Sequence, residues 1–104
     1  MKIIWTDFAI ENLKEIFDYF SENASKKIAK NIKKQIFAST KQLIKNPESG
    51  QIEFYLERLK KNHRYVLSGN YKIIYNIENG QIVIHDVFDV RQNPDKMNDE
   101  NRNK

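Results

Sequence analysis

The chain has 104 residues, of which 39% are hydrophobic, 12% aromatic and 31% charged, and its formal net charge is +4 at pH 7. This length predicts one domain with a modest core, and the lack of cysteine excludes disulfides, a thiolate zinc site and a cysteine nucleophile. Two histidines are too few for a His-rich metal site, so we expect no metal or cofactor. The positive net charge favours an anionic partner such as nucleic acid or an acidic protein segment.

The first half of the chain predicts a short strand followed by two helices of opposite charge. The strand is expected at residues 2–5, and Thr6 or Asp7 can cap a helix over residues 7–22 whose apolar and acidic side chains fall on opposite sides. A second helix is expected over residues 24–45, and it carries many lysines and no acid. Two interpretations of these charges are open. They orient the helices against each other through weak exposed ion pairs, or the lysine face meets nucleic acid.

Two apolar residues, Phe37 and Ile44, lie about a quarter turn away from the main apolar stripe of the second helix. Either they pack under the chain that follows Pro47, or they line a groove for a partner. After the helix stop at Asn46-Pro47, residues 47–58 are expected to form an irregular linker.

The second half of the chain predicts a three-stranded antiparallel meander with strands at about 63–68, 71–78 and 81–90. Two turn signals, Ser68-Gly69-Asn70 and Asn79-Gly80, separate runs rich in Val, Ile, Tyr and Phe. The predicted fold is therefore α+β: a short N-terminal strand and an antiparallel two-helix hairpin packed on a twisted antiparallel sheet.

Side-chain alternation divides the meander into two faces. The apolar and aromatic face, which the helices should cover, is expected to hold Tyr65, Leu67, Tyr71, Ile73, Tyr75, Ile77, Ile82, Ile84, Phe88 and Val90. The opposite face is mixed, and with a suitable register it would bring together a basic patch of Arg64, Lys72, His85 and Arg91. A face of this kind suits a nucleic-acid backbone or an anionic peptide with apolar anchors.

We expect a single domain over residues 1–94 and a polar, mobile tail over residues 95–104, which holds one apolar residue in ten. The sequence has no apolar run of membrane-spanning length and no signal-peptide pattern. The expected location is the cytoplasm, with no contact to a membrane.

The order of these elements, together with several local sequences, resembles the toxins of the RelE/ParE superfamily, the toxic halves of type II toxin–antitoxin modules. The resemblance extends over about residues 3–94. The sequences that carry it are Trp5-Thr6 at the first helix, Arg64-Tyr65, the run GNYKIIY from Gly69, and the closing VRQNP from Val90.

The resemblance implies a compact toxin that a cognate antitoxin neutralises by wrapping it with an acidic, amphipathic segment across the helix hairpin and the sheet. RelE-like members cleave mRNA on the ribosome, whereas ParE-like members inhibit DNA gyrase. The residues expected to bind target or antitoxin are Arg64, Lys72, His85, Arg91, Phe37 and Ile44.

Cleavage of RNA through its 2′-OH needs a base and cations that stabilise the charged phosphorane. The residues available for a RelE-like reaction are Lys60, Lys61, His63, Arg64 and Arg91, and His63 or His85 would carry the proton. However, Leu67 occupies the mid-strand position where RelE-like toxins carry an arginine, and no tyrosine follows Arg91. These departures favour a ParE-like inhibitor of gyrase. A ribosome-dependent mRNA endonuclease and a non-toxic basic binding module are the alternatives.

Overall fold

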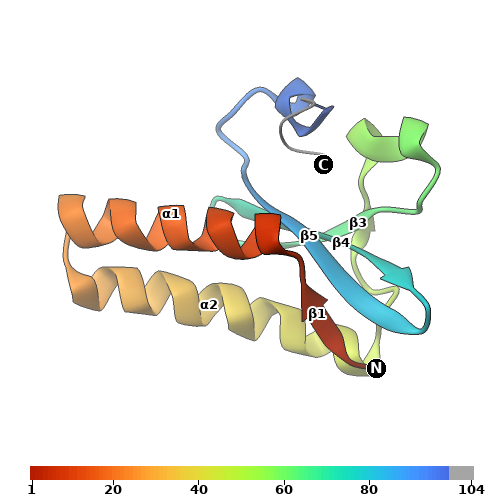
Figure 1. Ribbon diagram of the computed structural model, residues 1–104, viewed down its shortest axis with the longest axis horizontal. Helices are drawn as coiled ribbons and strands as arrows, with labels where there is room; N and C mark the ends of the chain where they lie inside the picture. The colour runs from red at the N-terminus through yellow and green to blue at the C-terminus, as the bar shows by residue number, and fades with distance from the viewer. Residues whose placement is uncertain (99–104) are drawn as a thin grey trace.

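The computed structural model describes residues 1–98 as a helix pair packed on a five-stranded mixed sheet (Figure 1). The sheet order is β1-β5-β4-β3-β2, in which β1 runs parallel to β5 and the other neighbouring strands are antiparallel. The elements are β1 (Ile3–Trp5), α1 (Asp7–Asn23), α2 (Lys26–Lys45), β2 (Gln51–Ile52), the 3-10 helix η1 (Phe54–Leu59), β3 (Arg64–Ser68), β4 (Tyr71–Glu78), β5 (Gln81–Asp89) and the 3-10 helix η2 (Pro94–Asn98). The predicted α+β class and the meander are confirmed, and β1 adds a parallel strand to it.

Each long helix begins at a side-chain cap. The Thr6 hydroxyl accepts the Ala9 N–H at 3.1 Å, and the Ser25 hydroxyl accepts the Ile28 N–H at 3.1 Å. Each cap satisfies one of the backbone donors that a helix leaves free in its first turn. The second helix therefore starts after Ser25, two residues later than the sequence pattern predicts.

The opposite charges of the two helices do not pair with each other. Within residues 1–98, no lysine of α2 lies within 4.0 Å of a carboxylate oxygen, and the three ion pairs found there all involve the sheet. The helices are instead held by the buried core that they share with the sheet, to which Leu13, Ile36 and Leu43 contribute. Ion pairing is thus not what orients the hairpin, and its surface charges are left for other contacts.

The sheet has an apolar core on each face. The larger one, under the helices, contains Val66, Ile73, Tyr75 and Ile84, and the smaller one contains Leu56, Ile74, Phe88 and Met97. Figure 1 shows the helix pair on one side of the sheet and the two 3-10 helices on the other.

The predicted division of the meander into faces is wrong in β3 and in the second half of β5. In β3, Val66 pairs with Ile73 and is buried, whereas Leu67 is 55% exposed. In β5, Asp86 pairs with Ile74 and Ile84 with Tyr75, so His85 is the extra residue of a β-bulge. A bulge reverses the alternation beyond it. Phe88 consequently lies on the face opposite to Ile84.

Two segments expected to be irregular are ordered. The predicted linker 47–58 contains β2 and η1, and β2 extends the sheet by pairing with Arg64 and Tyr65. The predicted mobile tail is wrong for residues 95–98, which belong to η2 and bury Met97 against the second core. The rest of that tail, residues 99–104, lies outside the described residues.

Candidate functional site

An apolar hollow opens between α1 and α2 near β1. It has a volume of about 460 Å³ and is lined by Trp5, Ile10, Leu13, Lys14, Phe17, Lys33 and Phe37. Phe37 is 39% exposed and its ring lies 5.1 Å from that of Trp5, while Ile10 is 50% exposed. The Lys33 ammonium lies 5.5 Å from the centre of the Phe17 ring. A hollow lined by aromatic rings and bordered by lysines offers both apolar and electrostatic contacts to a partner.

A second hollow of about 450 Å³ continues the first and is lined by Phe17, Lys30, Lys33, Lys34, Phe37, Ala38 and Lys41. We refer to the two hollows together as the lysine-rimmed groove. Of the two alternatives for Phe37, the structure places this residue in a groove rather than under the chain after Pro47. Ile44 is 47% exposed but does not line the groove.

The predicted basic patch does not form, because Arg64 and Lys72 lie on opposite faces. Arg64 pairs with Tyr75 on the helix side, and its Nη1 donates to the carbonyls of Glu48 at 3.1 Å and Gly50 at 2.9 Å. Lys72 lies on the other face, where its Nζ binds the buried Glu53 carboxylate at 2.9 Å. Both cations are thus occupied by internal contacts that tie the segment after α2 to the sheet.

Arg91 lies at the end of β5 and makes a two-pronged contact with Asp89. Its Nε donates to Oδ1 at 2.9 Å and its Nη2 to Oδ2 at 2.7 Å. These hydrogen bonds lower the pKa of Asp89 and raise that of Arg91. The pair borders a mixed hollow of about 450 Å³ lined by Asn12, Glu15, Ile16, Tyr19, Phe20, Tyr71, Val87, Asp89, Arg91 and Gln92. Arg91 is therefore exposed at the edge of a hollow that contains aromatic residues, and the Asp89 carboxylate offsets its charge.

His63 and His85 pack against each other at the opposite end of the meander, with ring centres 5.3 Å apart. The Nε2 of His85 lies 2.7 Å from Asn76 Oδ1 and 3.0 Å from Glu78 Oε2, and Asn76 donates to the Lys61 carbonyl at 3.1 Å. Burial lowers the pKa of His85, and the Glu78 carboxylate opposes that effect. Asn76 is buried and was not among the predicted site residues, although a lone amide inside an apolar strand was a visible signal.

His63 is 8% exposed, and desolvation by burial, followed by its cationic neighbours His85 and Lys61, lowers its pKa from 6.5 to about 4. Its Nδ1 is buried with no hydrogen-bond partner within residues 1–98. A ring that stays neutral until about pH 4 is suited to packing. The structure therefore favours a packing role for His63 over the role of proton carrier in RNA cleavage.

The lowered pKa of His63 predicts a loss of stability in mild acid. The unfolded chain protonates this residue at about pH 6.5 but the folded chain only at about pH 4, so stability falls as the pH drops through this window. We expect a loss of roughly 3 kcal/mol, the linkage value for a pKa that falls from 6.5 to about 4. Urea denaturation of the wild type and His63→Phe at both ends of the window measures it, and equal pH dependence of the two proteins would contradict the assignment.

The residues expected for RNA cleavage are split between the two ends of the sheet. Lys60, Lys61 and His63 precede β3. Arg91 follows β5 at the opposite end of the sheet, the end where β3 stops, because Ser68 pairs with Tyr71 and Tyr71 with Asp89. The length of β3 alone separates the two groups by roughly 13 Å. Within residues 1–98, no cluster of three or more His, Cys, Asp or Glu side chains is arranged to hold a metal ion. None of the helices described is long and apolar enough to cross a bilayer.

Comparisons with known proteins agree with this architecture. A solved structure described as the chromosomal ParDE TA system from P. aeruginosa superposes with a TM-score of 0.73, covering 86% of this chain and 96% of that chain at 17% sequence identity. At this identity the match shows a shared fold. No curated protein matches the sequence significantly. Residues 3–94 match the family described as ParE toxin of type II toxin-antitoxin system, parDE. The chain therefore belongs to the ParE toxin family of type II toxin–antitoxin systems.

Proposed function

We propose that this toxin acts in the cytoplasm as a non-enzymatic inhibitor of DNA gyrase and is neutralised by a cognate antitoxin of the ParD kind. We choose gyrase inhibition over RNA cleavage because the side chains that cleavage would need lie far apart. Cleavage of RNA needs a base and phosphorane-stabilising cations around one phosphate. Here Lys61 and His63 lie at one end of the meander and Arg91 at the other, and the mid-strand position holds the exposed Leu67.

Purified toxin tests this proposal directly. Added to gyrase and relaxed plasmid, it is expected to inhibit supercoiling in proportion to its concentration, and unchanged supercoiling at a large molar excess would overturn the gyrase target. Toeprinting on translating ribosomes tests the alternative. Codon-specific cuts made by the wild type and abolished in Arg91→Ala would establish a ribonuclease instead. Unimpaired growth on expression of the toxin alone would favour a non-toxic binding module.

The lysine-rimmed groove supports the antitoxin part of the proposal. Its floor is apolar, with Phe17 and Phe37 at the centre, and its α2 side carries Lys30, Lys34 and Lys41. An amphipathic helix buries an apolar stripe in such a groove, and acidic residues along its edges match the lysines. We therefore expect the neutralising segment of the antitoxin to be acidic and helical where it crosses α2.

Comparing a substitution inside the groove with one elsewhere on α2 tests whether the antitoxin binds in the groove. Phe37→Glu places a charge against Trp5 and repels an acidic segment. We expect antitoxin affinity to fall about 100-fold, the loss typical when an aromatic residue at the centre of an interface is replaced. Ile28→Glu is the matched control, because Ile28 is similarly exposed on α2 but does not line the groove. Titration calorimetry with the antitoxin measures both, and equal losses would exclude the groove as the docking site.

A further inference from the structure

We propose that this toxin holds its target protein through an arginine side chain of the target, which enters the mixed hollow beside Arg91. The hollow has a volume of about 450 Å³ and lies between α1 and the end of β5. We call it the tyrosine hollow after Tyr19 and Tyr71, which line it. The identity of the partner rests on the gyrase inhibition proposed above, whereas the chemistry of the hollow can be tested without gyrase.

Tyr71 presents an unpaired hydroxyl to the tyrosine hollow. The residue is only 8% exposed, and its hydroxyl forms no hydrogen bond within residues 1–98. This oxygen is not among the unpaired polar atoms that are sealed from solvent in that range, so a ligand can reach it. Burial raises the pKa of Tyr71, and the charges that also act on it, those of Asp89 and Arg91, belong to residues of the hollow. The hydroxyl is therefore available to hydrogen-bond a ligand there.

The other polar groups of the hollow are mainly acceptors. Asn12 donates its Nδ2 to Asp86 at 2.8 Å, and its amide oxygen has no partner in the described part of the chain. The Asp89 carboxylate accepts three hydrogen bonds from Arg91, which leaves one acceptor position on Oδ2 and engages the cation. Glu15 adds a second negative charge that forms no ion pair among the described residues. The lining therefore suits a positively charged ligand with several donors.

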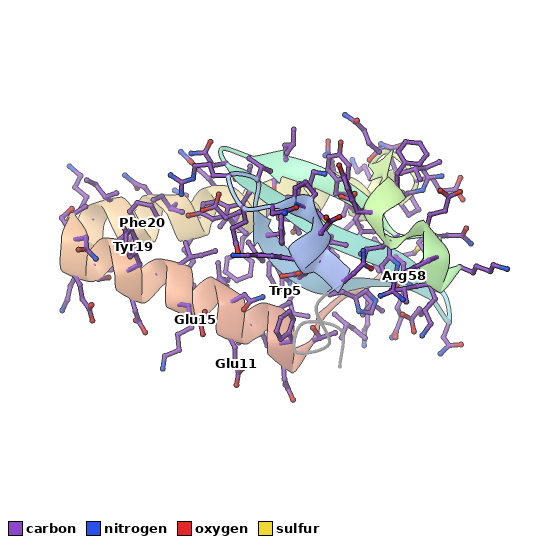
Figure 2. The ribbon with its side chains drawn as sticks, turned by 90° about the horizontal axis from the view of Figure 1, so that it is seen from above. Trp5, Glu11, Glu15, Tyr19, Phe20 and Arg58 are labelled. Carbon is purple, nitrogen blue, oxygen red and sulfur yellow. The ribbon has the colours of Figure 1, made fainter. Side chains whose placement is uncertain are left out.

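The aromatic residues of the hollow favour a guanidinium over an ammonium. Tyr19 is 59% exposed, and its ring lies edge-on to that of Phe20 with centres 5.2 Å apart. Figure 2 shows both side chains towards the C-terminal end of α1, with Glu15 one turn before them. A guanidinium is planar, stacks on aromatic rings and presents five N–H donors, whereas an ammonium is compact and strongly hydrated. An arginine side chain therefore fits the hollow better than a lysine.

The position and charge of the hollow separate its occupant from the antitoxin. At 3.6 residues per turn, the α1 residues of the tyrosine hollow and of the lysine-rimmed groove face opposite flanks of the helix. Those of the hollow are Asn12, Glu15, Ile16, Tyr19 and Phe20, and those of the groove are Ile10, Leu13, Lys14 and Phe17. Glu15 and Asp89 repel an acidic segment of the kind that suits the groove. A protein that works on DNA carries arginines for phosphate contacts, so gyrase is the matching partner.

A small probe tests the chemistry of the hollow without gyrase. N-acetyl-arginine methylamide, added to the isotope-labelled full chain, is expected to shift the amide signals of Tyr19, Tyr71 and Asp89 with a dissociation constant on the order of 1 mM, as suits one side chain. N-acetyl-citrulline methylamide has nearly the same shape without the charge, and we expect it to bind at least about tenfold more weakly. Equal binding of the two probes, or no binding of the arginine probe, would overturn the proposal.

Two substitutions locate the binding of the probe. Tyr71→Phe removes only the unpaired hydroxyl, and Tyr19→Ala removes an exposed ring, so both variants are expected to keep the wild-type circular dichroism. Each is expected to bind the arginine probe about five- to tenfold more weakly, because a hydrogen bond from a charged group or a cation–π contact is lost. Tyr55→Ala is the matched control, because Tyr55 is 46% exposed and does not line the hollow. Equal affinities in all three variants would contradict the assignment.

Supercoiling assays test the identity of the partner. We expect Tyr19→Ala and Tyr71→Phe to inhibit gyrase about tenfold less strongly than the wild type, and Tyr55→Ala to inhibit it like the wild type. Full inhibition by both hollow variants, or a loss of antitoxin affinity in its place, would overturn gyrase as the occupant and leave gyrase inhibition itself standing. A wild type that does not inhibit gyrase would instead overturn the proposed function, and the arginine probe would still decide the chemistry of the hollow.

Discussion

Replacing Lys72 with methionine is expected to lower the free energy of unfolding by about 3–5 kcal/mol, because the Glu53 carboxylate would lose the cation that compensates its burial. Glu53 is 2% exposed, and its Oε2 accepts a hydrogen bond from the Lys72 ammonium at 2.9 Å. That ammonium also lies 4.2 Å from the centre of the Tyr65 ring. Methionine keeps the length of the apolar stem, so the loss reports the missing charge rather than missing volume.

The double variant Glu53→Gln/Lys72→Met decides whether this explanation holds. A neutral amide keeps an acceptor for the Tyr55 N–H, which Glu53 binds at 3.3 Å, while removing the uncompensated charge. We expect it to recover most of the stability lost in the single variant when both are unfolded in urea. Arg91→Met is the matched control, because it breaks an ion pair whose cation is exposed to solvent, and no measurable change is expected. A double variant as unstable as Lys72→Met would contradict the assignment.

Gly50→Ala is expected to destabilise the fold by about 3 kcal/mol through overpacking. A Cβ at this position would lie 2.5 Å from the Tyr75 hydroxyl oxygen and 2.8 Å from the Tyr65 carbonyl oxygen. Neither neighbour can yield easily. Tyr75 is fully buried, donates its hydroxyl to the Pro47 carbonyl at 2.7 Å and accepts the Gly50 N–H at 3.0 Å. The new methyl group would therefore break the contact that holds the turn after α2 against the sheet.

Gly80→Asn is the control for this prediction. Gly80 has a φ of +72° in the hairpin turn, and nothing lies within 4 Å of a Cβ placed there. Asparagine adopts this left-handed conformation with little strain, so we expect a change within about 0.5 kcal/mol. Urea denaturation of the two variants separates a packing requirement at Gly50 from the conformational requirement at Gly80. Equal effects at both positions would show that Gly50 is not needed for close approach.

The sequence alone was sufficient for those parts of the fold that depend on neighbouring residues. Thr6, one of the two predicted candidates, caps the first helix, and the second ends at Lys45, just before the predicted stop at Asn46-Pro47. Both turns occur where Gly69 and Gly80 adopt positive φ. Caps, helical periodicity and tight turns are decided by groups within a few residues of each other, so their signals are local. The family resemblance also came from the sequence, whereas the choice between the two alternatives for Phe37 needed the structure.

What the tertiary structure decided was which distant residues meet. The bulge at His85 and the pairing of Val66 with Ile73 reverse the predicted faces, so the four expected cations form no common patch. Strand register depends on the summed packing of many side chains, and a shift of one residue moves every side chain to the other face. The burial of Met97 depends on a second core, made by Leu56, Ile74 and Phe88, that no local pattern predicts. The composition of the two helices set the charges of their outer surface, but only the packed structure left those charges unpaired.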